Sequence, residues 1–496
     1  MAGWRLYPID TASLVSYRFA ISTQSNVFVN APPGLPPGPS QSALVQLFRQ
    51  ARDPIGFFED CRKRFGDVYT TRLPGMPYSV TFALPEAAKE IFANPGDTMW
   101  AGEANEPIEF LVGRHALVRL DGQKHKRERK LMMPAVHGDR MAAYGTLMKE
   151  ITDEVIAGFR PGSVIDAQEA MQEITLRVIL ETVFGLPPGE AQDRLRAVLV
   201  EFMTNAVSPT VTIAAILAGG DRFRDFLSQK WTKVVDPMGA LGGLANWLPW
   251  GRIARSARDL DRLLYREIAE RRKVAAGRVD VMSMLIQAVD EEGRGLSDDE
   301  LRDEMMVLLI GGHETTATTL SWSLALCLRH PEVLAAVREE HDRVFAGGFD
   351  PARVAELKYA EAVVKEALRL YPIAPAVARR LKQPLTIAGY SLPEGVLVSP
   401  SIYHIQRDPN VWPDPLRFDP SRFIEKRPRP SEWLPFGGGV RTCLGMAFSL
   451  FEMRIVLSTV LRRTKLRPQG EIPRLSQRGI LLGPASPIRI VVESVD

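Results

Sequence analysis

One cysteine of this chain lies in a setting that favours chemistry. Residues 436–445 read FGGGVRTCLG, and an apolar helical stretch follows directly. Glycines on both sides of Cys443 permit a tight turn, and the positive end of a helix that begins near Leu444 would face the sulfur. We therefore expect Cys443 to favour the thiolate, which can be a nucleophile, a redox group or a metal ligand. The loop alone does not decide among these roles.

A second candidate site lies in the middle of a long predicted helix, residues 296–331. Ser297 and Glu300 have the spacing of a capping box, and the helical pattern stops before Pro331. At about 1.5 Å per residue, such a helix would be roughly 45 to 50 Å long. Its centre reads GGHETT, which is unusual for a simple core helix, because each glycine costs about 1 kcal/mol relative to alanine.

Two interpretations of this centre remain open. Gly311 and Gly312 could serve close helix packing, with Glu314 reaching solvent. Alternatively, the glycines form a groove in which a planar ligand or small molecule approaches the backbone, while Glu314 and Thr315 relay protons. We expect the isolated His313 to contact protein groups or solvent rather than a metal.

The totals exclude several classes of protein. The 496 residues carry 62 basic and 59 acidic side chains, a net charge of +3 that does not favour nucleic acid as a partner. Cys61, Cys327 and Cys443 are odd in number and widely separated, which argues against a disulfide framework and for a reducing cytoplasm. The first thirty residues contain no apolar run of roughly 18 residues, so we expect a soluble protein without a signal peptide or membrane span.

The pattern along the chain predicts a mainly α fold with a small β-rich part. A tail and a proline-rich hinge, residues 1–41, precede one folded domain, residues 42–496, that is mostly helical as far as about residue 345. Strands are expected in GDVYTTRL and YSVTFAL, and a hairpin in 385–403 that turns around Pro393, Glu394 and Gly395. The proline-dense segment 409–420 should be an irregular loop.

The cysteine loop resembles the haem-binding signature of the cytochrome P450 superfamily. The matching positions are Phe436, Gly437, Gly439, Arg441, Cys443 and Gly445. Three further motifs of the family occur in the expected order. They are a proline hinge in PPGLPPGP, the oxygen-activating stretch in GGHETT, and the ExxR pair Glu366 and Arg369 in KEALRLYP, with Arg422 in FDPSRF as the third member of a buried triad. The segment KHKRERKLMMPAVHGDRM (124–141) resembles that of soluble bacterial members that hydroxylate fatty acids and terpenoids.

The resemblance implies a triangular helical prism that holds haem b between the long central helix and the cysteine loop. Cys443 would be the axial ligand of the haem iron, and its electron donation would favour O–O cleavage. Phe436 would lie against the haem near the sulfur, while Gly437 and its neighbours let the loop pack close under the macrocycle. Thr315 would hydrogen-bond the bound oxygen, and Glu314 would pass protons to it so that water rather than peroxide leaves.

The haem carboxylates would need cationic partners. The candidates are Arg441, Arg379, His125 and Arg129. Some charges of KHKRERK (124–130) would be solvated, and the others could dock an acidic electron donor. That donor would be a ferredoxin with its reductase, or a flavodoxin, since 496 residues leave no room for fused redox domains. The resemblance also implies a monomer.

Apolar residues from several segments would line the substrate pocket and predict a hydrophobic small-molecule substrate. They are Phe110, Leu111, Ile310, Gly311, Ala374, Val377, Ile480 and Leu481. The main hypothesis is therefore a monooxygenase that uses O2 and two external electrons to hydroxylate or epoxidise a fatty acid, terpenoid, steroid or polyketide. One alternative is a haem-thiolate peroxygenase or rearranging enzyme that needs no reductase. The other is a haem-free lipid-binding protein or cysteine-nucleophile enzyme.

Overall fold

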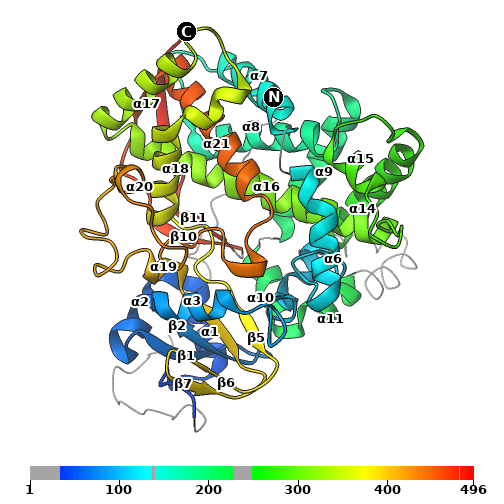
Figure 1. The fold of residues 1–496 in the computed structure, drawn as a ribbon, viewed down its shortest axis with the longest axis vertical. Helices are drawn as coiled ribbons and strands as arrows, with labels where there is room; N and C mark the ends of the chain where they lie inside the picture. Colours follow the sequence, from blue (N-terminus) through cyan, green and yellow to red (C-terminus); the bar gives the residue numbers. More distant parts are fainter. Residues whose placement is uncertain (1–33, 137–139, 207, 228–248, 480) are drawn as a thin grey trace.

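The computed structural model describes residues 34–136, 140–206, 208–227, 249–479 and 481–496. These residues form a large helical body and a smaller β-rich region at one end, as expected (Figure 1). In Figure 1 the strands β1, β2, β5, β6 and β7 gather at the bottom with α1, α2 and α3, while the other large helices fill the rest of the view.

The β-rich region joins distant parts of the chain. Its main sheet has the order β1-β2-β8-β5-β3. The strands are β1 (Val68–Arg72), β2 (Tyr78–Phe82), β3 (Met99–Trp100), β5 (Arg379–Leu381) and β8 (Leu397–Pro400). The pair β2–β8 is parallel and the other pairs are antiparallel. A separate core that includes Val80, Phe82 and Val398 lies here, so this region has its own apolar support.

A hairpin forms within 385–403, but the predicted position of its turn, at Pro393, Glu394 and Gly395, is wrong. The paired strands are β6 (Leu385–Ile387) and β7 (Tyr390–Leu392), which turn at Ala388 and Gly389 with φ of 47° and 83°. Two consecutive residues with positive φ form the tight turn whose twist suits a two-residue hairpin. The second turn, at Gly395, leads into β8, which pairs with β2 and β5 instead of with β7.

The long helix α16 (Asp298–Cys327) crosses the middle of the helical body (Figure 1). Ser297 caps its first turn, and the Glu300 side chain completes the predicted capping box. It packs against α8 (Ala167–Thr182), α18 (Lys358–Leu370) and α21 (Met446–Arg463). These contacts bury most of α16 beyond His313, which places its glycine-rich centre next to the molecular core.

The remaining elements surround this centre. The other helices are α1 (Ala43–Arg52), α2 (Pro54–Phe65), α3 (Pro85–Ala93), α4 (Ala101–Ala104), η2 (Glu106–Ile108), α5 (Glu109–Val112), α6 (Gly122–Met132), η3 (Met133–Val136), α7 (Arg140–Ala157), α9 (Glu190–Ala206), α10 (Pro209–Ala218), α11 (Gly220–Asp225), α14 (Pro249–Val274), α15 (Val281–Gln287), α17 (Pro331–Val344), η6 (Pro351–Glu356), α19 (Ile402–Ile405), α20 (Arg422–Glu425) and η7 (Gly439–Arg441). The other strands are β4 (Val164–Asp166), β9 (Thr464–Pro468), β10 (Leu475–Arg478), β11 (Leu481–Pro484) and β12 (Arg489–Val495).

The described part of the proline-rich hinge is packed on the β-rich region. The Thr70 amide donates to the Pro37 carbonyl at 2.9 Å, and the Thr70 hydroxyl donates to the Pro36 carbonyl at 2.7 Å. A Cβ on Gly38 would lie 1.8 Å from the Thr70 carbonyl oxygen, so the hinge approaches β1 as closely as only glycine allows. Most of the predicted tail, residues 1–33, lies outside the described residues.

Within the described part of the chain, no single helix is long and apolar enough to cross a membrane. By length and composition alone, Glu190–Ala206 together with Thr210–Ala218 would pass the same test as a pair bent by 68°.

Candidate active site

The Cys443 loop is held by its own backbone between η7 and α21. The Cys443 amide donates to the Phe436 carbonyl at 2.9 Å, and the Gly437 amide donates to the Leu434 carbonyl at 2.9 Å. Gly437 has a φ of 66°, a left-handed conformation that favours glycine. The Cys443 side chain remains exposed, which leaves its sulfur accessible to a ligand.

The neighbouring glycines let the loop pack closely against α3. A Cβ on Gly438 would lie 2.2 Å from the ring of Phe92 on α3, and one on Gly439 would lie 2.0 Å from the Phe92 carbonyl oxygen. These two glycines are therefore required by the contact with α3, and the packing of the loop under a macrocycle stays a prediction. Phe436 has an edge-to-face contact with Trp433, with ring centroids 5.8 Å apart.

The protein surroundings of Cys443 both favour and oppose its thiolate. Although part of the Cys443 side chain is exposed, the protein atoms packed around its sulfur raise the pKa of the thiol, whereas the amides of Gly445 and Met446, at the start of α21, and the charge of Arg129 lower it. The net effect of these protein groups on the pKa is upward, so the thiolate expected at Cys443 stays a prediction. A bound cation would be needed to hold the deprotonated form.

The two glycines of α16 have different surroundings: Gly312 packs closely against another helix, and Gly311 faces open space. A Cβ on Gly312 would lie 2.6 Å from Cδ1 of Ile179, so this glycine serves close packing against α8. A Cβ on Gly311 would meet nothing within 4 Å, and Gly311 is exposed. One turn later, the Thr315 hydroxyl donates to the Gly311 carbonyl. Gly311 and Thr315 therefore share an open face of α16, and the groove for a ligand at this face stays a prediction.

Glu314 points to a different neighbour from Thr315, because successive helix residues are rotated by about 100°. Gln172 donates to Oε2 of Glu314 at 2.6 Å, and Gln168 donates to Oε1 at 3.3 Å. Burial raises the pKa of Glu314, and the two glutamines and Arg478 lower it less. The carboxyl group therefore lies between α16 and α8 and not in solvent.

His313 is buried against α8, with Nδ1 2.9 Å from the Thr175 hydroxyl oxygen. Burial, helped by the charge of Arg196, lowers its pKa to about 4. This contact confirms the expectation that His313 contacts a protein group.

Arg441 and Arg379 lie close enough to influence each other's charge. Arg441 forms an ion pair with Asp121, whose carboxylate also accepts from the amides of Gly102 and Glu103 at 2.9 and 3.0 Å. Arg379 is buried, and burial together with Arg441 lowers its pKa to about 10. Its Nη1 donates to the Ala378 carbonyl at 2.9 Å, and no described carboxylate forms an ion pair with it.

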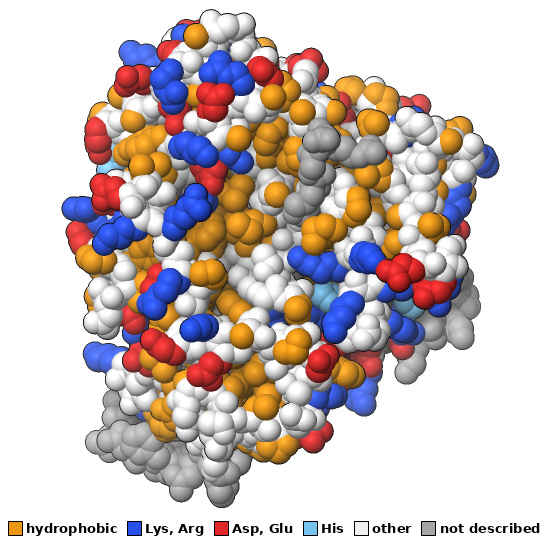
Figure 2. Space-filling model, in the orientation of Figure 1, with side chains coloured by type: hydrophobic (Ala, Val, Ile, Leu, Met, Phe, Trp, Pro, Cys, Tyr) orange, Lys and Arg blue, Asp and Glu red, His pale blue; other side chains and the backbone are white. Residues whose placement is uncertain are grey.

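His125 and Arg129 of α6 belong to the same positive cluster. Burial and the charges of Arg441, Arg129 and Arg379 lower the pKa of His125 to about 3. No described residue forms a salt bridge with Arg129, and burial lowers its pKa although Cys443 raises it. Figure 2 shows basic side chains and a histidine gathered beside the middle of one face.

This cluster fits a group that brings its own anions. Four cationic or titratable side chains lie near a single described carboxylate, that of Asp121, which already accepts from two amides and Arg441. Buried charges without partners are costly, so a ligand with carboxylates would relieve them. Haem b has two such groups, and Cys443 supplies the sulfur on which the resemblance places its iron.

The predicted triad comes together beside the cysteine loop. Glu366 accepts from Arg369 at 2.6 and 2.8 Å, and both side chains are fully buried. Arg422 Nε lies 3.5 Å from Glu366 Oε1. Arg369 also donates to the carbonyls of Gln406 and Pro415, at 2.9 and 2.7 Å. The triad thereby fixes the irregular loop that precedes Cys443.

The predicted substrate residues fall into separate groups. Phe110, Leu111 and Ile310 belong to the main core, while Ala374 and Val377 pack on a smaller one around Ile402. Leu481 begins β11, and its neighbour Leu482 donates to the Ile373 carbonyl at 2.8 Å. Gly311 is the exposed member of the set, and Ile480 lies outside the described residues.

An ion pair with a buried carboxylate joins α5, which carries two of the predicted substrate residues, to α11. Glu109 of α5 accepts from Arg119 at 2.8 Å and from Arg224 of α11 at 2.9 Å. The rings of Phe110 and Phe223 have centroids 5.5 Å apart beside this pair. Neither Phe223 nor the glutamines of α8 were predicted as site residues. The available signal was the spacing of Gln168 and Gln172, which are four residues apart and therefore lie on one face of the helix.

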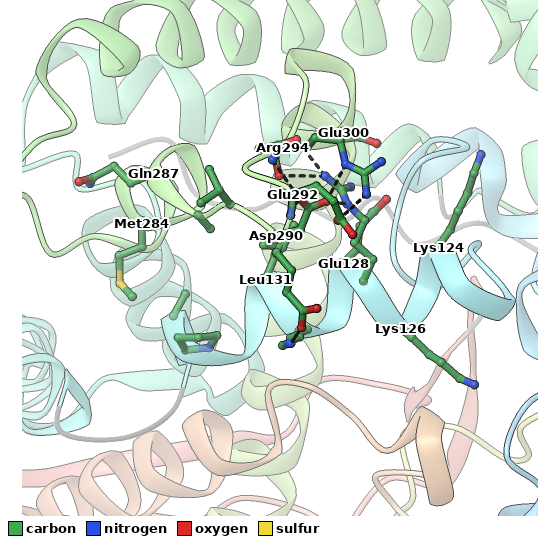
Figure 3. Close-up of a pocket in the computed structure, with 18 of the residues that line it drawn as sticks. Lys124, Lys126, Glu128, Leu131, Met284, Gln287, Asp290, Glu292, Arg294 and Glu300 are labelled. Carbon is green, nitrogen blue, oxygen red and sulfur yellow. Dashed lines mark hydrogen bonds and ion pairs between the residues drawn. The ribbon is translucent and has the colours of Figure 1, made fainter.

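A surface cavity of about 1480 Å³ lies apart from these groups, between α6 and the segment 284–300 (Figure 3). Its charged residues are largely paired, since Arg127 lies 2.6 Å from Asp290 and Lys130 lies 2.5 Å from Glu291. In Figure 3 Lys124 and Lys126 point away from this network. Part of the KHKRERK charge therefore forms a solvated ion-pair surface.

Comparisons with known proteins show the family of this chain. The family model described as Cytochrome P450 matches residues 32–492. The protein named cytochrome P450 135B1 of Mycobacterium tuberculosis is 37% identical over 466 residues, which are 93% of this chain and 92% of that protein. Cytochrome P450 135A1 of the same species is 34% identical over 444 residues, covering 88% and 90%.

A solved structure supports the fold. Retinoic acid-bound cyanobacterial CYP120A1 has a TM-score of 0.75 at 22% identity, over 89% of this chain and 95% of that one. The family match and the mycobacterial relatives extend over nearly the whole chain and include the cysteine loop. This chain belongs to the cytochrome P450 family and is a haem b-binding monooxygenase.

Proposed function

We propose that this enzyme hydroxylates or epoxidises a hydrophobic small molecule, with O2 as the oxygen source and an external protein as the electron donor. For hydroxylation, one oxygen atom enters a C–H bond, and two electrons and two protons convert the other to water. The observation that carries the proposal is the open face at Gly311, which has Thr315 one turn later and the buried Glu314 beside it.

Cys443 is the residue that would hold the cofactor through its sulfur. When bound to this thiolate, haem b supplies the binding of O2 and the cleavage of its O–O bond. The amides of Gly445 and Met446 stabilise the negative sulfur. The positive cluster described above would orient the carboxylates of the group. Its members are Arg441, Arg379, His125 and Arg129.

Thr315 and Glu314 divide the handling of protons. The Thr315 hydroxyl lies on the open face and donates to the Gly311 carbonyl, so its oxygen can accept a hydrogen bond from a ligand there. Glu314 is the neighbouring acid, and burial raises its pKa toward the range in which it can take up and release a proton. Together they would direct protons so that water forms instead of peroxide.

The substrate would be apolar. Phe110, Leu111 and Ile310 present hydrocarbon surface from α5 and α16, and Leu481 adds more from β11. Such surfaces select by shape and not by charge, which suits a fatty acid, terpenoid, steroid or polyketide. The Glu109–Arg224 pair between α5 and α11 would hold the two segments together over the bound molecule.

An external ferredoxin with its reductase, or a flavodoxin, would supply the electrons. The support is the exposed basic side chains of α6 that are turned away from the ion-pair surface, Lys124 and Lys126, which could attract an acidic donor (Figure 3). We expect the enzyme to work as a monomer. The haem-free alternative is set aside, because members of this family bind haem b.

Turnover of the haem-loaded protein under ¹⁸O2 tests the proposal. With a ferredoxin, its reductase and candidate apolar substrates, we expect one labelled oxygen atom in the product. Thr315→Ala should divert electrons to peroxide, and Thr315→Ser, which keeps the hydroxyl, should restore much of the coupling. Product formed from peroxide but not from the ferredoxin system would favour the peroxygenase alternative instead.

A further inference from the structure

The glutamine pair of α8 makes an unusual contact with the acid of α16. Gln172 donates to one carboxylate oxygen of Glu314 at 2.6 Å, and Gln168 donates to the other at 3.3 Å. Both glutamines are more than nine-tenths buried, with 9% and 3% of their surface exposed. Two neutral amides therefore bind both oxygens of a carboxyl group inside the protein.

Charged groups act on Glu314 only from a distance. Arg478 of β10 lowers the pKa of Glu314, yet its Nε donates to the Pro484 carbonyl at 3.0 Å and no hydrogen bond joins it to the acid. His313, the neighbour on the same helix, contacts Thr175. Among the described residues, the hydrogen bonds to the Glu314 carboxyl group come from amides.

An amide can serve both protonation states of an acid. Its N–H donates to a carboxylate, and its carbonyl accepts from a protonated carboxyl group. Gln168 has a free acceptor, because its Oε1 is buried without a hydrogen-bond partner. Its Nε2 also donates to Thr318 at 3.0 Å. A lysine or arginine in the same place would instead stabilise the anion alone.

We propose that Gln168 and Gln172 are positioning residues that hold the Glu314 carboxyl group in both its charged and its neutral form. The amide of Gln168 turns when the acid takes up a proton, so that its free carbonyl accepts the new O–H. This inference rests on the proposed role of Glu314 in delivering protons beside Thr315. Gln168 and Gln172 would keep the acid in place through each cycle without fixing its charge.

Infrared spectroscopy of the haem-loaded full chain tests this inference without turnover. The carbonyl band of the protonated carboxyl group is followed against pH, and Glu314→Gln identifies the band of Glu314. Gln172→Lys should move the titration of Glu314 to lower pH by about one unit or more, a tenfold change in proton affinity. Gln172→Met, which removes the donor at similar volume, should move the titration to higher pH.

Thr175→Val is the matched control, because Thr175 lies on the same face of α8 and binds His313 instead of Glu314. It should leave the titration of Glu314 unchanged. A merely structural role predicts the same small shift in all three variants, and that result would overturn the inference. If Gln172→Lys does not fold, an unmoved titration in Gln172→Met has the same meaning.

The inference and the proposed function fail in different ways. If the two Gln172 variants shift the titration in opposite directions but coupling of electrons to product is unchanged in both, the positioning role holds and the proton-delivery role of Glu314 fails. If Glu314→Gln loses coupling while the Gln172 variants do not move the titration, proton delivery holds and the positioning role fails.

Discussion

Gly312 of α16 faces Ile179 of α8 so closely that a Cβ on the glycine would lie 2.6 Å from Cδ1 of the isoleucine. The adjacent Gly311 has open space in the same test. The two adjacent glycines of this continuous helix thus have different surroundings. One glycine lets α8 approach, and the other leaves room beside the helix for a ligand.

Alanine at the two positions should have opposite effects on stability. Gly311→Ala should raise the free energy of unfolding, by up to about 1 kcal/mol from helix propensity alone. Gly312→Ala gains the same propensity but overpacks the buried Ile179, at a cost of about 1 to 3 kcal/mol, so we expect it to be neutral or destabilising. Chemical unfolding of the haem-loaded variants measures both.

The double variant Gly312→Ala/Ile179→Val is the control for this explanation. Valine lacks Cδ1, the atom that the new methyl group would meet, so the pair should couple favourably in a double-mutant cycle. Additive effects of the two substitutions would show that the Gly312–Ile179 contact does not limit the approach of the helices.

Loss of the buried Glu366 charge should destabilise the protein strongly. Glu366→Gln leaves the guanidinium of Arg369 buried without its counter-ion, which typically costs about 3 to 5 kcal/mol. The matched control is Glu356→Gln, because Glu356 pairs with Arg353 at the same i,i+3 spacing but with side chains 46% and 39% exposed. That surface pair should contribute less than about 1 kcal/mol. Equal losses in the two variants would contradict a supporting role for the triad.

Local patterns predicted some of these features and missed others for physical reasons. The capping box at Ser297 and the limits of α16 follow from neighbouring residues, and both were predicted closely. The turn of the β6–β7 hairpin was misplaced, because Gly389 and Gly395 both suit turns and the choice depends on β8 pairing with β2, a distant segment. Such pairing leaves no local signal.

In the candidate site, too, some features were predicted from the sequence and others were missed. The residues of the cysteine loop and the triad were predicted from short motifs. The contact of Gln172 with Glu314 depends on which faces of α8 and α16 meet, and that is decided by packing over the whole core. The role of Gly438 against Phe92 is of the same kind, since α3 is far from the loop in sequence.

Buried His313 should make the protein less stable in mild acid. Its pKa is lowered to about 4 in the folded state from 6.5, so below pH 6.5 the unfolded chain binds a proton that the folded chain does not. The free energy of unfolding is therefore unaffected by this titration above pH 6.5. Below it, the titration of His313 lowers the free energy of unfolding by about 1.4 kcal/mol per pH unit as the pH drops toward 4. His313→Gln should lose less stability than the natural protein over this window. Parallel loss in both proteins would contradict this prediction.

We expect Arg379 to lower the stability of the haem-free chain and to strengthen haem binding. Arg379→Met removes a buried charge that has no described carboxylate partner, so the haem-free chain should become more stable. The same variant should release haem about tenfold faster or more, because a charge-assisted hydrogen bond contributes about 1.5 to 3 kcal/mol. Thermal unfolding and haem transfer to an acceptor protein measure the two effects.

The neighbouring Arg380 provides the control for Arg379. Its side chain is 41% exposed and lies 3.5 Å from Glu103. Arg380→Met should change neither haem release nor the stability of the haem-free chain by more than a small amount. Faster haem release from this variant as well would point to a general loss of charge at this surface and not to a specific contact of Arg379.

The absorption spectrum of the dithionite-reduced protein under carbon monoxide tests the central claim most directly. With Cys443 as the thiolate ligand, the natural protein should show a strongly red-shifted Soret band, and Cys443→His should lose that shift while it still binds haem. A histidine-type spectrum from the natural protein, or a red-shifted band that persists in Cys443→His, would contradict the assignment of Cys443 as the axial ligand.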